Sequence, residues 1–139
     1  MIPPELYRSI VDVLPILCVD LVIEEDGQYL LVKRTKEPLK GRWWVPGGRV
    51  LKGEAIAEAA RRKAREELGV EAQVTGVLGY YEDQYEENEF GLESGTHTVS
   101  IVVLVRLASM DIRLDAQSSA WKLADALPEG FKVRPFVQG

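Results

Sequence analysis

The 139-residue sequence contains only one cysteine, Cys18, and one histidine, His97. A single cysteine excludes an internal disulfide framework, and its place in an apolar run predicts a reduced core thiol of an intracellular protein. No apolar run approaches the ~20 residues that a membrane-spanning helix needs, and the first residues lack the basic-then-apolar order of a secretion signal. These absences predict a cytoplasmic protein with no membrane partner.

The chain also lacks an excess of positive charge. It has 17 lysines and arginines against 22 acidic residues, a net charge of -5. Proteins that bind nucleic acids usually have a basic patch, so we expect no nucleic-acid partner. An acidic protein can still bind a polyphosphate when a divalent cation lies between the two.

The length is sufficient for one hydrophobic core, and no repeat, low-complexity tract or linker divides the chain. We therefore expect a single domain over residues 1–139. Hydrophobic spacing predicts helices at 3–13, 54–68 and 120–127, and strands at 16–25, 28–34, 49–51, 74–81 and 96–107. Asp26-Gly27 is a hairpin turn signal, and residues 82–95 form an acidic loop. This irregular mixture predicts an α+β fold with a mixed sheet covered by helices.

Two adjacent glutamates, Glu66 and Glu67, lie near the end of the predicted helix 54–68. Like charges are unfavourable there, because the carbonyl end of the helix dipole is already negative. One interpretation is a solvated helix surface on which Arg62 and Arg65 balance the glutamates.

The glycine pair before this helix favours a second interpretation, a metal site. Gly47-Gly48 allows the backbone to approach a ligand closely. A backbone carbonyl together with Glu66 and Glu67 forms an oxygen-rich site of the kind that suits Mg²⁺. Such a cation would relieve the repulsion between the two carboxylates.

The same segment resembles the Nudix hydrolase box, G-x5-E-x7-R-E-U-x-E-E-x-G-U, in which U is a bulky aliphatic residue. Seven fixed positions within 23 residues are in register, namely Gly48, Glu54, Arg62, Glu66, Glu67, Gly69 and Val70. The resemblance implies the Nudix α/β/α sandwich with a mixed β-sheet. It also implies Mg²⁺- or Mn²⁺-dependent hydrolysis of a nucleoside diphosphate linked to another group, with Glu54, Arg62 and Glu66 as catalytic residues.

Two longer segments resemble the GDP-mannose mannosyl hydrolase branch of this family. They are "CVDLVIEEDGQYLLVKRTKEPLKGRWWVPGGRV" and "YEENEFGLESGTHTV". The branch implies metal ligands at the Gly47 carbonyl, Glu67 and Gln117, and the box register adds Glu66 as a second or water-mediated ligand. It implies substrate contacts at Asp20, Arg34, Arg49 and His97.

The chemistry of these substrate residues is compatible with a nucleotide substrate. Arg34 and Arg49 suit phosphate oxygens, although a strand-end arginine is often only solvated. Asp20 suits a hydroxyl of a base or sugar, or a contact between two copies of the chain in a homodimer. His97 suits a phosphate or leaving oxygen, and without the resemblance it would be interpreted as structural.

Two positions depart from the family pattern. Lys63 replaces the glutamate that follows Arg62 in the box, and Ser118 stands where the mannosyl hydrolase branch has its basic histidine. Loss of a general base typically costs ~10²–10⁴ in rate. Three alternatives remain: a carboxylate such as Glu66 or one of the acidic loop takes the proton, the cation alone activates the water, or turnover is slow.

We therefore carry two hypotheses from the sequence. The first is a Mg²⁺-dependent hydrolase of a nucleoside diphosphate derivative, nucleotide sugars included. The second is a catalytically weak domain that binds a nucleotide without productive turnover. The missing base at Ser118 favours attack at phosphorus over attack at the sugar carbon.

Overall fold

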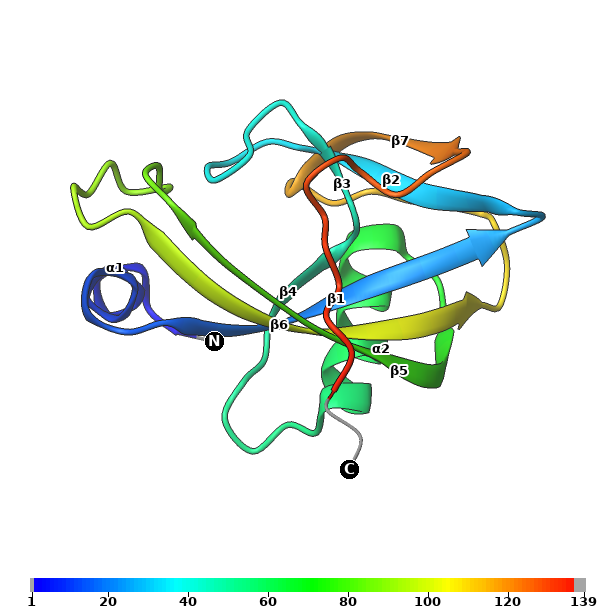
Figure 1. The fold of residues 1–139 in the computed structure, drawn as a ribbon, viewed down its shortest axis with the longest axis horizontal. Helices are drawn as coiled ribbons and strands as arrows, with labels where there is room; N and C mark the ends of the chain where they lie inside the picture. The colour runs from blue at the N-terminus through cyan, green and yellow to red at the C-terminus, as the bar shows by residue number, and fades with distance from the viewer. Residues whose placement is uncertain (1, 137–139) are drawn as a thin grey trace.

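The computed structural model describes residues 2–136, so Met1 and residues 137–139 of the expected domain lie outside it. Its elements in chain order are α1 (Pro4–Val13), β1 (Ile16–Glu25), β2 (Gln28–Arg34), β3 (Trp43–Trp44), β4 (Gly47–Arg49), α2 (Ile56–Leu68), β5 (Ala72–Tyr85), β6 (Thr96–Leu107) and β7 (Ser118–Ala124). Figure 1 shows the strands in a splayed arrangement, with α1 at one end. None of the helices described is long and apolar enough to cross a membrane.

The strands form one mixed sheet in the order β3-β2-β1-β6-β5, to which β4 is added at β1 and β7 at β2. β1 runs parallel to β6, whereas the other pairings are antiparallel. This architecture confirms the predicted α+β fold with a mixed sheet. The predicted hairpin is also confirmed: Asp26 and Gly27 both have positive φ, 51° and 81°, between β1 and β2, as a type I′ turn requires.

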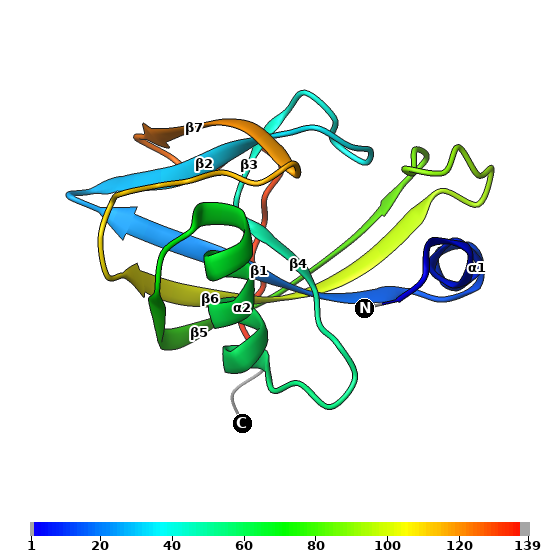
Figure 2. The ribbon, with the colours of Figure 1, turned by 180° about the vertical axis from the view of Figure 1, so that it is seen from behind.

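Helix α2 covers one face of the sheet (Figure 2). Its inward stripe consists of Ala59, Ala60, Ala64 and Leu68, all completely buried. Three of these residues are alanines, so the helix backbone can lie close to the strands. The helix ends at Gly69, whose φ of 70° is the left-handed conformation of a helix C-terminus.

The helix predicted at 120–127 is wrong. The chain there forms β7, which pairs with β2 and places Trp121 opposite Val32 and Leu123 opposite Leu30. The local sequence is rich in helix-forming residues, but β2 offers a free edge along its length. Backbone pairing with that edge outweighs the weak local preference for helix.

The face of the sheet opposite α2 is covered by the C-terminal segment, which crosses β5 in an extended form (Figure 1). Arg134 forms a backbone bridge with Tyr80. Phe131 packs on Tyr81 and Trp44, with ring centroids 5.4 and 5.5 Å apart. Trp44 is therefore a core residue, as its position next to Val45 predicts.

Other details of the elements also differ from prediction. β5 continues to Tyr85, so only residues 86–95 form the loop that was predicted from residue 82. β4 includes the glycine pair itself, because Gly47 and Gly48 pair with Asp20 and Val19 of β1. Cys18 is a free thiol, but it is half-buried and lines a cavity.

Candidate functional site

A cavity of about 850 Å³ lies between the end of α2, the glycine strand β4, the loop after β2, and the 86–95 loop. Most of the site residues predicted from sequence line it, namely Asp20, Arg34, Gly47, Arg49, Arg62, Glu66, Glu67 and Gln117. Segments far apart in the chain thus meet at one cavity, next to β1, which pairs with β2, β4 and β6.

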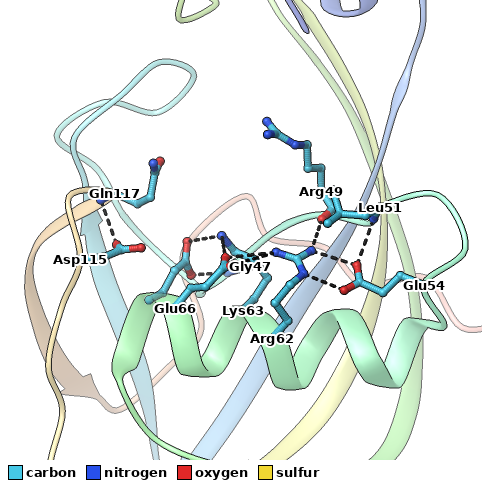
Figure 3. A network of polar contacts seen from close by, with 10 residues as sticks. Gly47, Arg49, Leu51, Glu54, Arg62, Lys63, Glu66, Asp115 and Gln117 are labelled. Atoms are coloured by element: carbon cyan, nitrogen blue, oxygen red, sulfur yellow. Dashed lines mark hydrogen bonds and ion pairs between the residues drawn. The ribbon is translucent and has the colours of Figure 1, made fainter. Parts of the chain in front are cut away.

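Arg62 organises one side of the cavity. Its guanidinium donates to Glu54 at 2.6 and 2.9 Å and to Glu66 at 3.1 and 3.3 Å. It also donates to the Arg49 backbone carbonyl at 2.9 Å, as Figure 3 shows. The hydrogen bonds from Arg62 hold the pKa of Glu54 below its usual value. Glu54 therefore remains ionised and fixes Arg62, and it also accepts the Leu51 N–H at 3.0 Å.

Glu67 is the buried carboxylate of the pair. Its side chain is 6% exposed, against 45% for Glu66. One oxygen accepts the Gly47 N–H at 3.0 Å, and the other lies 3.5 Å from the Lys63 ammonium. Burial raises the pKa of Glu67, and Lys63 and the Gly47 hydrogen bond oppose that shift.

The backbone of β4 directs its polar groups toward α2. The N–H of Gly47 bonds Glu67, and the carbonyl of Arg49, two residues later, bonds Arg62. Alternate residues of a strand present their backbone N–H and C=O to the same edge. The Gly47 carbonyl therefore also faces the end of α2, as its predicted role as a metal ligand requires.

Glycine is required at position 47 by close packing. A Cβ there would lie 2.7 Å from the Asp20 side-chain oxygen Oδ1, and closer still to the backbone of β1. Real Cβ atoms do not approach other atoms so closely. The absence of a side chain thus permits the strand to lie against β1 with its carbonyl next to the carboxylates.

The described part of the chain holds no group of three or more His, Cys, Asp or Glu side chains arranged as a ready metal site. Lys63 lies between Glu66 and Glu67, with its ammonium 3.5 Å from an oxygen of each. The donors available are all oxygens: two glutamates, the Gly47 carbonyl and the Gln117 side chain. This donor set fits a hard divalent cation that keeps several water ligands.

Sequence reasoning missed Asp115, which lines the cavity in the segment between β6 and β7. Its negative charge contributes to the raised pKa of Glu67. One of its oxygens accepts the Gln117 N–H at 2.9 Å, so the carboxylate is held beside the predicted metal ligands (Figure 3). Its position two residues before Gln117 is the signal that the sequence offers, and it lies outside the acidic loop at residues 82–95.

Asp20 is a buried carboxylate in the centre of the sheet, 8% exposed. Burial raises its pKa to about 7, and a hydrogen bond from Ser100 and the charge of Arg34 act in the opposite direction. Arg34 itself donates from Nε to the Pro38 carbonyl at 2.8 Å, which leaves its terminal nitrogens as the part available to a ligand.

The Arg49 side chain, predicted to bind a phosphate, is stacked on an aromatic ring. Its guanidinium lies 4.1 Å from the ring centroid of Tyr7 in α1, a cation–π contact. Tyr7 in turn meets Phe90 edge-on, with centroids 5.9 Å apart. Tyr7 and Phe90, neither of which sequence reasoning selected, thus give the cavity an aromatic end formed by α1 and the 86–95 loop.

His97 is not brought together with the other predicted residues. The residues of β6 that line the cavity are Thr96, Thr98 and Ser100. Side chains alternate between the two faces of a strand, so His97 points to the opposite face. It pairs with Gln84 of β5, a position that fits the structural interpretation considered from sequence alone.

A family model described as the NUDIX domain matches residues 15–134. The chain belongs to the Nudix family of hydrolases. The match includes the box and nearly all of the sheet, so it covers both sides of the cavity. Only α1 and the last residues lie outside it, and α1 supplies Tyr7 of the aromatic end.

Similar proteins come from archaea and bacteria. The Low-salt glycan biosynthesis protein Agl8 of Haloferax volcanii is 35% identical over 137 residues, which are 99% of this chain and 86% of that protein. An ADP-ribose pyrophosphatase of Methanocaldococcus jannaschii is 32% identical, over 83% of this chain and 66% of that protein. The crystal structure of a MutT NUDIX hydrolase from Burkholderia pseudomallei superposes with a TM-score of 0.71 at 27% identity, covering 85% of this chain and 90% of that one. The Nudix fold and hydrolase class thus agree with the box.

Proposed function

We propose that this Nudix chain is a Mg²⁺-dependent hydrolase of a nucleoside diphosphate linked to a second group, with nucleotide sugars as the first candidates. The observation that carries the proposal is the polarity of the cavity. The α2 glutamates, the Gly47 carbonyl and the buried Asp20 lie at one end, and Tyr7 and Phe90 lie toward the other, beside Arg49. A nucleotide diphosphate, which has a charged group next to a ring system, has the same distribution of chemistry.

The names of similar proteins support both parts of this substrate class. One is an ADP-ribose pyrophosphatase, and another is a glycan biosynthesis protein. The first name indicates a diphosphate between two groups, and the second indicates sugar chemistry. Nucleotide sugars are therefore the first substrates to test.

Glu67 and the Gly47 carbonyl would hold the cation, with Gln117 as a further oxygen ligand and Glu66 acting through a bound water. When bound, Mg²⁺ or Mn²⁺ supplies a Lewis acid that neutralises phosphate charge and lowers the pKa of water. The protein contributes position: Arg62 fixes Glu66, and the Gly47 N–H fixes Glu67.

The phosphates would be bound by arginine. Arg34 is already oriented by the Pro38 carbonyl, so its terminal nitrogens need lose little freedom on binding. Arg49 is stacked on Tyr7, and an arginine in such a stack can still donate in its plane to an oxygen.

We infer that Asp115 takes the proton of the attacking water. Ser118 is buried in β7 and is not a cavity residue, and Lys63 is a cation. Glu66 and Asp115 both line the cavity, but Glu66 is engaged by Arg62 whereas Asp115 accepts one backbone hydrogen bond. A base at Asp115, beside the metal ligands, favours attack at phosphorus over attack at the sugar carbon.

A screen of nucleoside diphosphate derivatives with Mg²⁺, followed by identification of the products, tests this function. Hydrolysis in ¹⁸O-labelled water should place the label in a phosphate of the product. Label confined to the released sugar would contradict attack at phosphorus and would leave the hydrolase assignment intact.

A second candidate function, nucleotide binding without productive turnover, is favoured by Lys63 and Ser118. Both positions lack the base that other members of the family use there. The same screen, together with calorimetry, separates the two candidates. A domain that binds without turnover should bind a nucleotide by calorimetry and give no product at any Mg²⁺ concentration.

A further inference from the structure

Lys63 is enclosed within the site. Its side chain is 12% exposed, and its ammonium lies 3.5 Å from an oxygen of Glu66 and 3.5 Å from an oxygen of Glu67. Figure 3 shows it between the helix and the glycine strand. An ordinary surface lysine at a helix end would extend into water and make no such paired contact.

Packing against Gly48 holds the lysine stem in this place. A Cβ at Gly48 would lie 2.7 Å from Cε and 3.1 Å from Nζ of Lys63. Glycine at this position therefore leaves the space that the lysine occupies. This contact decides against the alternative in which Lys63 points to solvent.

The lysine also compensates charge that would otherwise be costly. Glu67 is buried, and among residues 2–136 its only close donor besides Lys63 is the Gly47 N–H. A buried carboxylate without a cation is strongly disfavoured, and it would be neutralised or displaced. Lys63 supplies the positive charge whether or not a divalent ion is present.

A divalent ion between Glu66 and Glu67 would have to lie next to this ammonium. Two cations at such a distance repel each other strongly in a partly buried site. The position is therefore closed to a second ion, whereas the Glu67 oxygen next to Gly47 is the one left for an ion.

We propose that Lys63 is a resident cation of the site, which takes the place of one divalent ion and binds the diphosphate of the ligand directly. The part on diphosphate binding rests on the proposed function, and the part on metal number does not. Lys63 lines the cavity, so its ammonium faces the space in which the diphosphate would lie.

Metal number is tested by titrating Mn²⁺ into wild type, Lys63→Glu and Lys63→Met, with calorimetry and counting of bound ions. We expect one ion in wild type and a second ion in Lys63→Glu, which restores a carboxylate. Lys63→Met keeps an apolar stem against Gly48 and removes the charge, so it should bind the first ion more tightly than wild type. The same stoichiometry and affinity in all three proteins would overturn the proposal.

Direct diphosphate binding is tested with inorganic pyrophosphate in EDTA. We expect measurable binding by wild type and binding weaker by about tenfold or more in Lys63→Met, because a charge-assisted hydrogen bond is lost. The matched control is Lys52→Met, which removes an exposed lysine that does not line the cavity and should bind like wild type. Equal binding by Lys63→Met and wild type would contradict the diphosphate role.

Circular dichroism shows whether each variant is folded. Should Lys63→Met prove poorly folded, Lys63→Arg replaces it as the test: it keeps the charge and should retain most of the pyrophosphate binding. These experiments measure binding only. A failure of the nucleotide screen would therefore refute the proposed hydrolase function without affecting the metal count, and an unchanged metal count would refute the role of Lys63 alone.

Discussion

The backbone N–H of Gly47 donates to Glu67 across 3.0 Å, and this bond joins the glycine strand to the last turn of α2. It places the backbone of strand β4 next to a buried carboxylate, two groups that lie 20 positions apart in the chain.

Glu67→Gln should retain the fold and lose function. A glutamine oxygen can still accept the Gly47 N–H, but the charge that binds a divalent ion is gone. We expect Mg²⁺-dependent turnover to fall by about 10²-fold or more, since metal assistance contributes several kcal/mol. Glu58→Gln, an exposed change in the first turn of the same helix, is the control and should behave as wild type. Full activity of Glu67→Gln at saturating Mg²⁺ would sink the assignment.

Arg62→Gln should lower both stability and turnover. The change removes the donors of Glu54 and of the Arg49 carbonyl, which are partly buried, and of the more exposed Glu66. We expect a loss of about 1–3 kcal/mol in the free energy of unfolding, measured in urea. Arg65→Gln removes the exposed ion pair between Arg65 of the same helix and Glu71, which lies just before β5. It should cost at most about 1 kcal/mol, and an equal loss in both variants would show that the Arg62 network has no special role.

Asp115→Asn tests the base that the structure suggests. Asparagine keeps the size and can accept the Gln117 N–H, but it cannot take a proton. We expect turnover to fall by ~10²–10⁴ while nucleotide binding stays close to wild type. Asp111→Asn alters a nearby exposed carboxylate, 74% accessible, and should leave turnover unchanged. If Asp115→Asn turns over at the rate of wild type, the proton must go elsewhere.

Asp20→Asn should change the pH dependence of stability in the metal-free protein. Burial raises the pKa of Asp20 to about 7, whereas an aspartate in an unfolded chain titrates near ~3.9. Between these values the folded state binds more protons, so the free energy of unfolding falls as pH rises. Asparagine cannot ionise, so the variant should be more stable than wild type above pH ~7, by roughly 2–4 kcal/mol.

Urea unfolding in EDTA at a series of pH values measures this effect. Asp26→Asn, the same substitution in the exposed hairpin turn, should keep the slope of wild type. Parallel profiles for Asp20→Asn and wild type would show that the Asp20 carboxylate does not titrate in this range.

Local features of the sequence predicted much of the fold and the part of the site that lies on β4 and α2. The alanine stripe of α2, the Asp26-Gly27 turn and the box spacing each depend on residues close together in the chain. The contact between Gly47 and Glu67 is also predictable in this way, because only a short loop separates β4 from α2 and the helix packs back against the strand.

Features that depend on distant pairing were not predictable in this way. The 120–127 segment became β7 because β2 had a free edge, a fact of the tertiary structure. Asp115 enters the cavity only because β7 returns to β2. His97 was assigned by resemblance, and the alternation of β6 turns it away from the cavity.

The parallel pairing of β1 with β6 affects how the chain folds. Strands so far apart in sequence pair slowly, since the chain between them must close a large loop first. During synthesis the glycine strand and α2 emerge early and can approach each other before β6 exists. The Asp20 side of the cavity needs β6, and the Asp115 side needs β7. The cavity is therefore complete only after β6 has paired with β1 and β7 has paired with β2.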